Sequence, residues 1–209
     1  MAIASSEALS RVERRRAGVI AESLDHAIGI MTEQGVGALS ISEVARRMGM
    51  RGPSLYKYFP SLHALYDALF AYGIVDQQAS IHPLVERLPR GVPRIRAAAV
   101  GLVRWSMENP ALAQLLHWRP VPGFEPSRES FELSVRDMDV ARDEFAEAVR
   151  LGQLVPEAAT DDALRLYTVL LSGVITQQLA NEPGVPYEDG AFSGLTETAI
   201  DLFLSAYRP

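Results

Sequence analysis

The chain has 209 residues, of which 48% are hydrophobic, and its formal net charge at pH 7 is −6. Such a chain is long and apolar enough for one sizeable core or two small ones, and its composition argues against disorder. It has no cysteine, which excludes disulfides and thiolate metal sites. The sequence shows no secretory signal and no apolar run near the ~18 residues that span a bilayer. We therefore expect a cytoplasmic protein without a membrane partner.

The charge is distributed unevenly along the chain. Residues 1–60 hold eight basic and six acidic side chains, whereas the rest of the chain holds twelve basic and twenty acidic ones. A basic head on an acidic body is the asymmetry expected when only the head meets a polyanion. Chance imbalance among solvated charges is the alternative interpretation of this feature.

The first predicted helix covers about 14–34, because apolar residues from Ile20 to Met31 recur at helical spacing and Gly35 ends the pattern. Ser40 and Glu43 then form an S-x-x-E capping box, which predicts the start of a second, short helix that stops at Gly49.

A third short helix is predicted to begin at Pro53, which suits a first helical turn, and to end before Pro60. Leu55, Phe59 and one tyrosine are expected to tie this short helix to the core, because a helix of this length needs tertiary packing.

The remainder of the chain also has helical periodicity and no strand-like alternation. Helices are predicted over about 61–80, up to about 108, over 111–118, 127–151, 161–180 and 192–207. The three prolines of "HPLVERLPRGVP" predict a linker after the fourth helix. The fold class is therefore all-α, with about nine helices: an N-terminal helix-turn-helix domain over 1–60 and a C-terminal helical bundle over 61–209.

The second and third predicted helices, separated by a turn with glycine, form a helix-turn-helix pattern. In that motif the second helix enters the major groove of DNA, while the first crosses the phosphate backbone. Arg and Lys donate to guanine, and Tyr hydroxyls and helix N-termini bind phosphates. The predicted DNA-binding residues are Ser40, Ser42, Arg46, Arg51, Gly52, Pro53, Ser54, Tyr56, Lys57 and Tyr58.

The segment "ISEVARRMGMRGPSLYKYFPSLHALYDALF" resembles the DNA-binding head of the TetR family of bacterial transcription repressors. The resemblance rests on Gly35, Val44-Ala45, Gly49 and the run Leu55–Ser61, and it is specific over about 20–70. One position departs from the family pattern. The family usually has a lysine two residues after the proline, where this chain has Leu62, so we expect one phosphate contact to be missing.

The resemblance implies a ligand-binding and dimerising helical body. It implies a homodimer through the last two helices, with residues from Leu164 to Leu179 along one side and Ser172-Gly173 allowing close approach. The alternative is that these apolar residues fill the core of a single chain. A two-fold dimer would need a palindromic double-stranded DNA operator.

The resemblance also implies a pocket for an unidentified small-molecule effector. Because pockets are mostly apolar, bulky side chains on the central helices are the candidates, although core packing is the commoner role of each. The predicted ligand-binding residues are Trp105, Met107, Trp118, Phe124, Phe131, Met138 and Tyr167.

Other functional classes have little support in the sequence. The four histidines are scattered, and there is no H-E-x-x-H pair, nucleophile elbow or P-loop, so no catalytic residue, metal site or cofactor is predicted. A helical enzyme and a protein-interaction module remain the alternatives. The predicted function is a DNA-binding regulator of transcription, a repressor that a small-molecule inducer releases from its operator.

Overall fold

The computed structural model describes residues 10–209, and this part of the chain is helical without any β-strand. Its nine α-helices confirm the predicted fold class. They are α1 (Arg11–Gln34), α2 (Ile41–Arg47), α3 (Gly52–Leu55), α4 (Leu62–Val85), α5 (Val92–Glu108), α6 (Pro110–His117), α7 (Arg128–Arg150), α8 (Asp161–Asn181) and α9 (Thr196–Ala206). Three 3-10 turns, η1 (Val36–Ala38), η2 (Pro156–Ala159) and η3 (Ser193–Leu195), join them.

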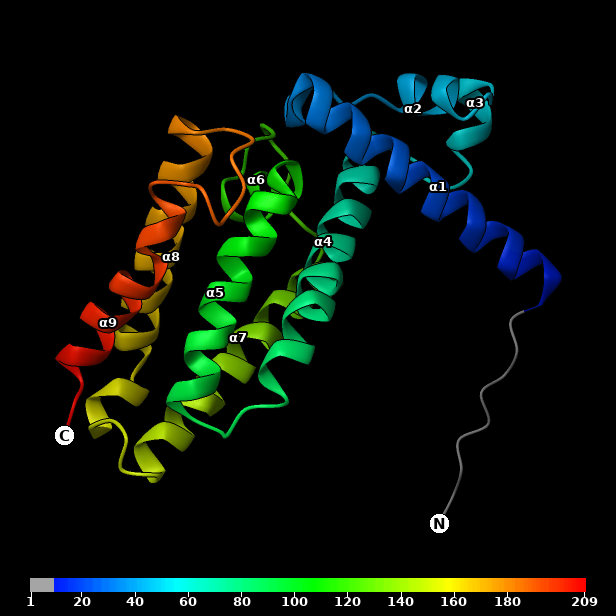
Figure 1. Ribbon diagram of the computed structural model, residues 1–209. Coiled ribbons are helices and arrows are strands. Elements are labelled where there is room, and N and C mark those ends of the chain that lie inside the picture. The colour runs from blue at the N-terminus through cyan, green and yellow to red at the C-terminus, as the bar shows by residue number, and fades with distance from the viewer. Residues whose placement is uncertain (1–9) are drawn as a thin grey trace, which may run out of the picture.

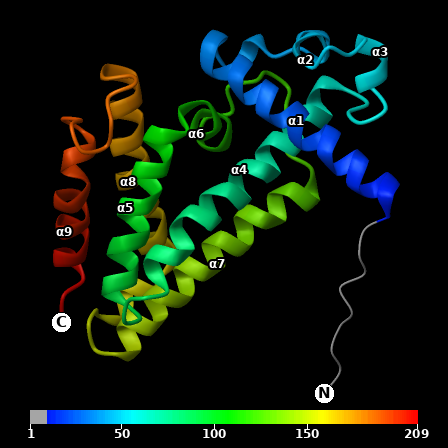
Figure 2. The same ribbon diagram turned by 45° about the vertical axis from the view of Figure 1, so that its right-hand side comes forward.

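The helices form a small head at one end of a long bundle (Figure 1). Helices α1, α2 and α3 make the head, and α4 leads out of it into the body. Helix α5 lies at the centre of the body, where it contacts α4, α6, α7, α8 and α9. Figure 2 shows α4 and α7 running side by side away from the head, with α8 and α9 on the opposite side of α5.

Two clusters of buried apolar side chains hold the chain together. The first joins the head to the first half of α4, to α6 and to Val121 and Phe124 of the loop before α7. The second lies among α5, α7, α8 and α9. Because the first cluster crosses residue 60, α4 packs with the head at one end and with the body at the other.

The structure differs from the predicted helix boundaries where local caps or long-range packing decide them. Helix α1 begins at Arg11 instead of about residue 14, because the Ser10 side chain and Glu13 form a capping box. Helix α4 does not stop near residue 80 but continues through Pro83, so the predicted linker is reduced to 86–91. Pro83 removes one helical hydrogen bond, and α4 ends two residues later at Val85.

Two other helices are shorter than predicted. The helical part of the third element ends at Leu55, and a hydrogen-bonded turn, with Tyr58 and Phe59 N–H donating to the Leu55 carbonyl, completes it. The final helix begins at Thr196, because residues 193–195 form the tighter turn η3.

Candidate nucleic-acid interface and effector cavity

The helix-turn-helix is positioned by caps and by buried side chains. The Ser40 hydroxyl accepts a hydrogen bond from the Glu43 N–H at 3.2 Å, which starts α2. Gly49 then takes a φ of +66°, a left-handed conformation that glycine adopts without strain, and the chain turns into α3. Leu55 and Phe59 are buried in the first core cluster, as predicted.

The predicted DNA-contacting residues belong to α2, to α3 and to the residues that flank these two helices. Ser42, Arg46, Arg51, Pro53, Tyr56 and Lys57 are exposed, whereas Ser40, Gly52, Ser54 and Tyr58 are partly buried. The short length of α3 places Tyr56, Lys57 and Tyr58 in the turn that follows the helix. The side chains of Arg51 and Lys57 have no carboxylate partner within residues 10–209. Their charges are therefore available to phosphates or base edges.

The two arginines at the end of α2 differ in exposure, and Arg47 is the less exposed one. Its guanidinium pairs with Glu33 of α1 at 2.6 Å and with Glu43 at 3.1 Å, and its side chain is only 20% exposed. Arg46 is exposed but also pairs with Glu43. Hydrogen bonds from Arg46 and Arg47 lower the pKa of Glu43 to about 2. Arg47 therefore fixes α2 against α1 instead of facing DNA.

Arg16 of α1 also contacts the third element, and it was not among the predicted site residues. Its guanidinium lies 5.2 Å from the centre of the Tyr58 ring, and its Nη1 donates to the Lys57 carbonyl at 3.4 Å. Arg16 precedes Ile20 by four residues, so extending the apolar stripe of α1 by one turn would have placed it against the third element.

Leu62 occupies the position where the resemblance places a lysine. It is partly buried and packs against the first core cluster, so it offers no donor to a phosphate. The neighbouring His63 is exposed, and its ring contacts Phe124 edge-on at 5.9 Å.

The body contains a cavity of about 410 Å³ between α4, α5, α7 and α8. Gln77 and Gln78 of α4 line it, together with Asp137 of α7. A second hollow of about 530 Å³ lies between α5 and α9, but its Arg96 and Arg104 already pair with Asp201 and Glu188. The first cavity is the better candidate for a ligand, because four helices surround it and most of its lining is apolar.

Only two of the predicted ligand-binding residues, Met138 and Tyr167, line this cavity. The Tyr167 hydroxyl donates to the Ile95 carbonyl at 3.0 Å, and burial raises its pKa, so the ring serves as a wall of the cavity.

The other five predicted ligand-binding residues lie elsewhere. Trp105 is buried and donates to Asp76 at 2.8 Å, and Met107 belongs to the second core cluster. Trp118 donates to Thr176. Phe124 packs between His63 and Tyr66. Phe131 is 53% exposed on α7.

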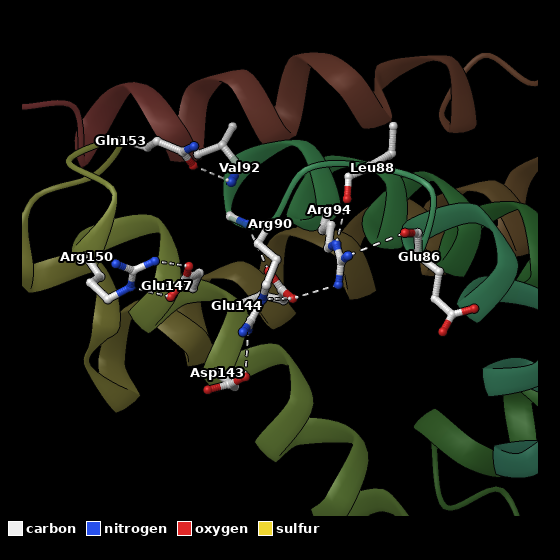
Figure 3. A network of polar contacts seen from close by, with 11 residues as sticks. Glu86, Leu88, Arg90, Val92, Arg94, Asp143, Glu144, Glu147, Arg150 and Gln153 are labelled. Atoms are coloured by element: carbon white, nitrogen blue, oxygen red, sulfur yellow. Dashed lines mark hydrogen bonds and ion pairs between the residues drawn. The ribbon is translucent and has the colours of Figure 1, made fainter.

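A polar network lies around the start of α5 (Figure 3), and its Arg94 and Glu144 are lining residues of the cavity. Glu144 of α7 accepts hydrogen bonds from Arg90 Nε at 2.9 Å, from Gly91 N–H at 2.9 Å and from Arg94 Nη1 at 3.4 Å. Gln153 accepts from the Val92 N–H at 2.8 Å. Helix α5 begins at a glycine that offers no side-chain cap, and these side chains supply acceptors for its first N–H groups.

Near the middle of α4 the polar contacts are sparse. The Asp137 carboxylate accepts one long hydrogen bond, 3.4 Å, from Gln78, and burial raises its pKa. The side chain of Gln77 is buried, and no acceptor within residues 10–209 lies in hydrogen-bonding distance of its Nε2. Neither glutamine nor Asp137 was among the predicted ligand-binding residues, because the sequence does not show which polar residues of different helices meet.

Helices α2 and α3 of the head have a helix-turn-helix arrangement, and comparisons with known proteins agree with it. Residues 24–69 match the sequence model of the family described as bacterial regulatory proteins, tetR family. The HTH-type transcriptional regulator Rv1816 of Mycobacterium tuberculosis is 26% identical over 139 residues, which are 63% of this chain and 56% of that protein. The aligned part thus spans little more than half the length of the curated relatives.

Solved structures share the fold over most of the chain. The TetR family transcriptional regulator PfmR of Thermus thermophilus superposes with a TM-score of 0.68 at 18% identity, over 88% of this chain and 97% of that one. The transcriptional regulator FadR of Bacillus subtilis, solved with stearoyl-CoA, gives 0.75 at 13% identity over 88% and 97%.

Together these findings show that residues 24–69 are similar to the tetR family of bacterial regulatory proteins and that the chain shares the fold of solved transcriptional regulators. No helix in residues 10–209 combines the length and the apolar character that a membrane crossing requires.

The two buried glutamines of the body give a paired stability prediction. Gln77→Leu removes an unpaired buried donor, so we expect the ligand-free protein to become more stable by about 1 kcal/mol. Gln178 is also buried, but its amide bonds Glu182 and the N–H groups of Phe192 and Ser193. Gln178→Leu should therefore destabilise the protein by about 1–3 kcal/mol. Urea unfolding of both variants measures the difference, and equal losses in both would contradict it.

Proposed function

We propose that the chain is a cytoplasmic, ligand-controlled repressor that binds a palindromic operator as a homodimer. The observation that carries the proposal is the course of α4, which begins in the DNA-binding head and lines the cavity of the body. The proposal keeps the division into a DNA-binding domain over 1–60 and a ligand-binding and dimerisation domain over 61–209. Gene regulation by an effector needs both sites and a physical connection between them.

In the proposed complex α3 enters the major groove and Arg51, at its N-terminal end, donates to a base edge. Lys57 and Tyr56, in the turn that follows, contact phosphates, and Ser42 and Arg46 approach the backbone from α2. The exposure of these five side chains supports the assignment. The proposed surface also includes five residues whose main role is to set the backbone conformation: Ser40, Gly52, Pro53, Ser54 and Tyr58.

The proposed connection between cavity and head runs along α4. Its Tyr66 hydroxyl donates to the Val36 carbonyl of the head at 2.6 Å. On the next residue, the Asp67 carboxylate accepts from the Ser127 N–H at 2.6 Å and from the hydroxyls of Ser127 and Ser130 at 2.9 Å, which ties α4 to the start of α7. A ligand that separates α4 from α7 in the cavity would therefore turn α4 about this attachment and move the head.

A small-molecule effector is proposed for the cavity, with Met138 and Tyr167 in its wall. The stearoyl-CoA in the FadR structure supports the idea that a body of this fold holds such a molecule. The effector favours release from DNA only by its differential affinity for the two arrangements of the heads. The roles of Trp105, Met107, Trp118, Phe124 and Phe131 are proposed to be packing and support, since none of them lines the cavity.

The proposed dimer uses a different side of α8 from the stripe that the sequence indicated. Leu164, Tyr167, Leu171 and Ile175 are buried in the chain's own second core cluster, so they serve this core. The outward side of α8 instead carries Leu166 and Val169, which are 44% and 64% exposed, and α9 adds Leu202 at 65%. Exposed leucine and valine side chains at helical spacing on two adjacent helices fit a self-complementary interface.

Substitution of Arg51 and Lys57, the two helix-turn-helix cations without an ion-pair partner in residues 10–209, tests DNA binding. Arg51→Ala should weaken binding to the intergenic DNA upstream of the gene by about 1–3 kcal/mol and relax specificity at one base position. Lys57→Ala should weaken binding to all sequences alike and lower the salt slope by about one. Arg128→Ala, at a 93% exposed arginine side chain of α7, is the matched control. Fluorescence anisotropy at two salt concentrations measures these effects, and wild-type affinity in both head variants would refute the assignment.

Introducing a charge at Leu202 tests the dimer. A buried arginine without a partner costs about 3–5 kcal/mol, so Leu202→Arg should convert a dimer into a monomer. Val75→Arg places the same charge at a 53% exposed position of α4 and should leave the dimer intact. Sedimentation equilibrium distinguishes the two states. A monomeric wild type, or a dimeric Leu202→Arg variant, would contradict the proposed interface.

A further inference from the structure

Gln77 is the exception among the buried polar side chains of the described chain. The six others all make hydrogen bonds within the protein; they are Ser23, Ser106, Ser130, Gln178, Ser193 and Thr196. Gln77 is 3% exposed and its Nε2 has no acceptor. Buried polar groups are paired in nearly all folded proteins, so an unpaired amide at the wall of a cavity points to a partner that occupies the cavity.

Gln77 lies in the apolar stripe of α4 that faces inward. Phe70, Gly73 and Ile74 precede it on this side of the helix, and all three are buried. An apolar residue at position 77 would continue the packing without any cost. The amide therefore introduces a donor and an acceptor where the fold itself has no use for them.

Asp137 is the second polar group of the cavity whose hydrogen-bonding capacity is largely unused. It faces α4 from α7, and within the described chain its carboxylate accepts only the 3.4 Å hydrogen bond from Gln78. Burial disfavours the charged form of this carboxyl and raises its pKa. A donor supplied by a ligand would stabilise the carboxylate, whereas a second carboxylate beside it would be repelled.

The remaining polar side chains of the lining are either engaged or at the rim. Arg94 and Glu144 pair with each other in the network of Figure 3, and His82 pairs with Glu86 at 3.4 Å on the surface. Arg136 is exposed. Gln78 donates to Asp137, and Tyr167 donates to the Ile95 carbonyl. Gln77 and Asp137 thus keep the most unused hydrogen-bonding capacity in the cavity, one on each of the two helices that a ligand would separate.

We infer that the cavity selects an uncharged, mostly apolar molecule with a group that both accepts and donates a hydrogen bond, such as an amide or a hydroxyl. Its oxygen accepts from the Gln77 amide, and its N–H or O–H donates to the Asp137 carboxylate. The inference rests on the proposed role of this cavity as the effector site, and it adds the chemical class of the effector.

Other head groups fit the two residues less well. A carboxylate satisfies Gln77 but meets the negative charge of Asp137. An ammonium group donates to Asp137 but has no oxygen for Gln77 Nε2, which stays unpaired. An amide or hydroxyl satisfies both residues, and the apolar lining accepts the rest of the molecule.

Four probes with the same chain length and different head groups test this class: octanamide, 1-octanol, octanoate and octylammonium. Isothermal titration calorimetry on the full chain at pH 7.5 gives their affinities. We expect octanamide and 1-octanol to bind at least about tenfold more tightly than octanoate and octylammonium. Gln77→Leu should lose about tenfold in octanamide affinity while it remains folded by circular dichroism.

Asp137→Asn removes the negative charge and should therefore lower the ratio of octanamide affinity to octanoate affinity. Gln34→Leu, at an exposed glutamine of the head, and Asp139→Asn, at an exposed aspartate of α7, are the matched controls and should bind like the wild type. Octanoate or octylammonium binding as tightly as octanamide, unchanged octanamide affinity in Gln77→Leu, or no binding of any probe would each overturn the inference. Anisotropy on DNA without probes, measured on the same preparation, reports separately on the proposed DNA-binding function.

Discussion

Two adjacent residues of α4, Tyr66 and Asp67, hold the head and the body in one relative position. The Tyr66 hydroxyl bonds the carbonyl of Val36 in the head, and the Asp67 carboxylate receives Ser127 and Ser130 at the start of α7. Tyr66 is 1% exposed and packs against Phe124, so its hydrogen bond is shielded from water. The orientation of the proposed DNA-binding surface therefore depends on the position of α4. The position of α4 in turn depends on α7 and on whether the cavity between the two helices is occupied.

The electrostatics of the head show how an acidic protein can bind a polyanion. Two of the four cations of the helix-turn-helix are occupied: Arg47 pairs with Glu33 and Glu43, and Arg46 pairs with Glu43. These ion pairs orient α2 against α1, while Arg51 and Lys57 keep their charge for a partner. The acidic body lies behind the head along α4 and away from this surface (Figure 1). The overall charge of −6 is thus a poor guide to the local potential at α3.

Features that depend on nearby residues could be predicted from the sequence. The turn at Gly49 and the buried anchors Leu55 and Phe59 are set within a few residues and were predicted correctly. Of the predicted capping box only the Ser40 half forms, because the Glu43 carboxylate pairs with Arg46 and Arg47. Helix ends were less accurate where packing decides them, as in α4, whose Pro83 suggested an earlier end than the structure has. The end of the short α3 could not be predicted from the sequence either, because the turn after it is completed by the Leu55 carbonyl and by Arg16 of α1.

The cavity could not be predicted in detail for a physical reason. An aromatic or methionine side chain has the same sequence pattern whether it fills a core or borders a void, so Trp105 and Met138 could not be told apart. Gln77 and Asp137 are 60 positions apart in the sequence, and only the packing of α4 against α7 brings both into one cavity. A glutamine within the buried stripe of α4 was the one local sign of this site.

The central claim is that occupation of the cavity changes DNA binding through α4, and a cavity-filling substitution tests it without knowledge of the effector. Ala141 lines the cavity, whereas Ala146 on the same helix is exposed, so Ala141→Phe and Ala146→Phe form a matched pair. Their affinities for the upstream intergenic DNA should be measured by fluorescence anisotropy, with thermal unfolding to establish that both are folded. We expect Ala141→Phe to bind roughly 5–150-fold more weakly than the wild type, the usual range of allosteric coupling, and Ala146→Phe to bind normally. Equal affinity of a folded Ala141→Phe variant and the wild type would contradict the coupling between the cavity and the head.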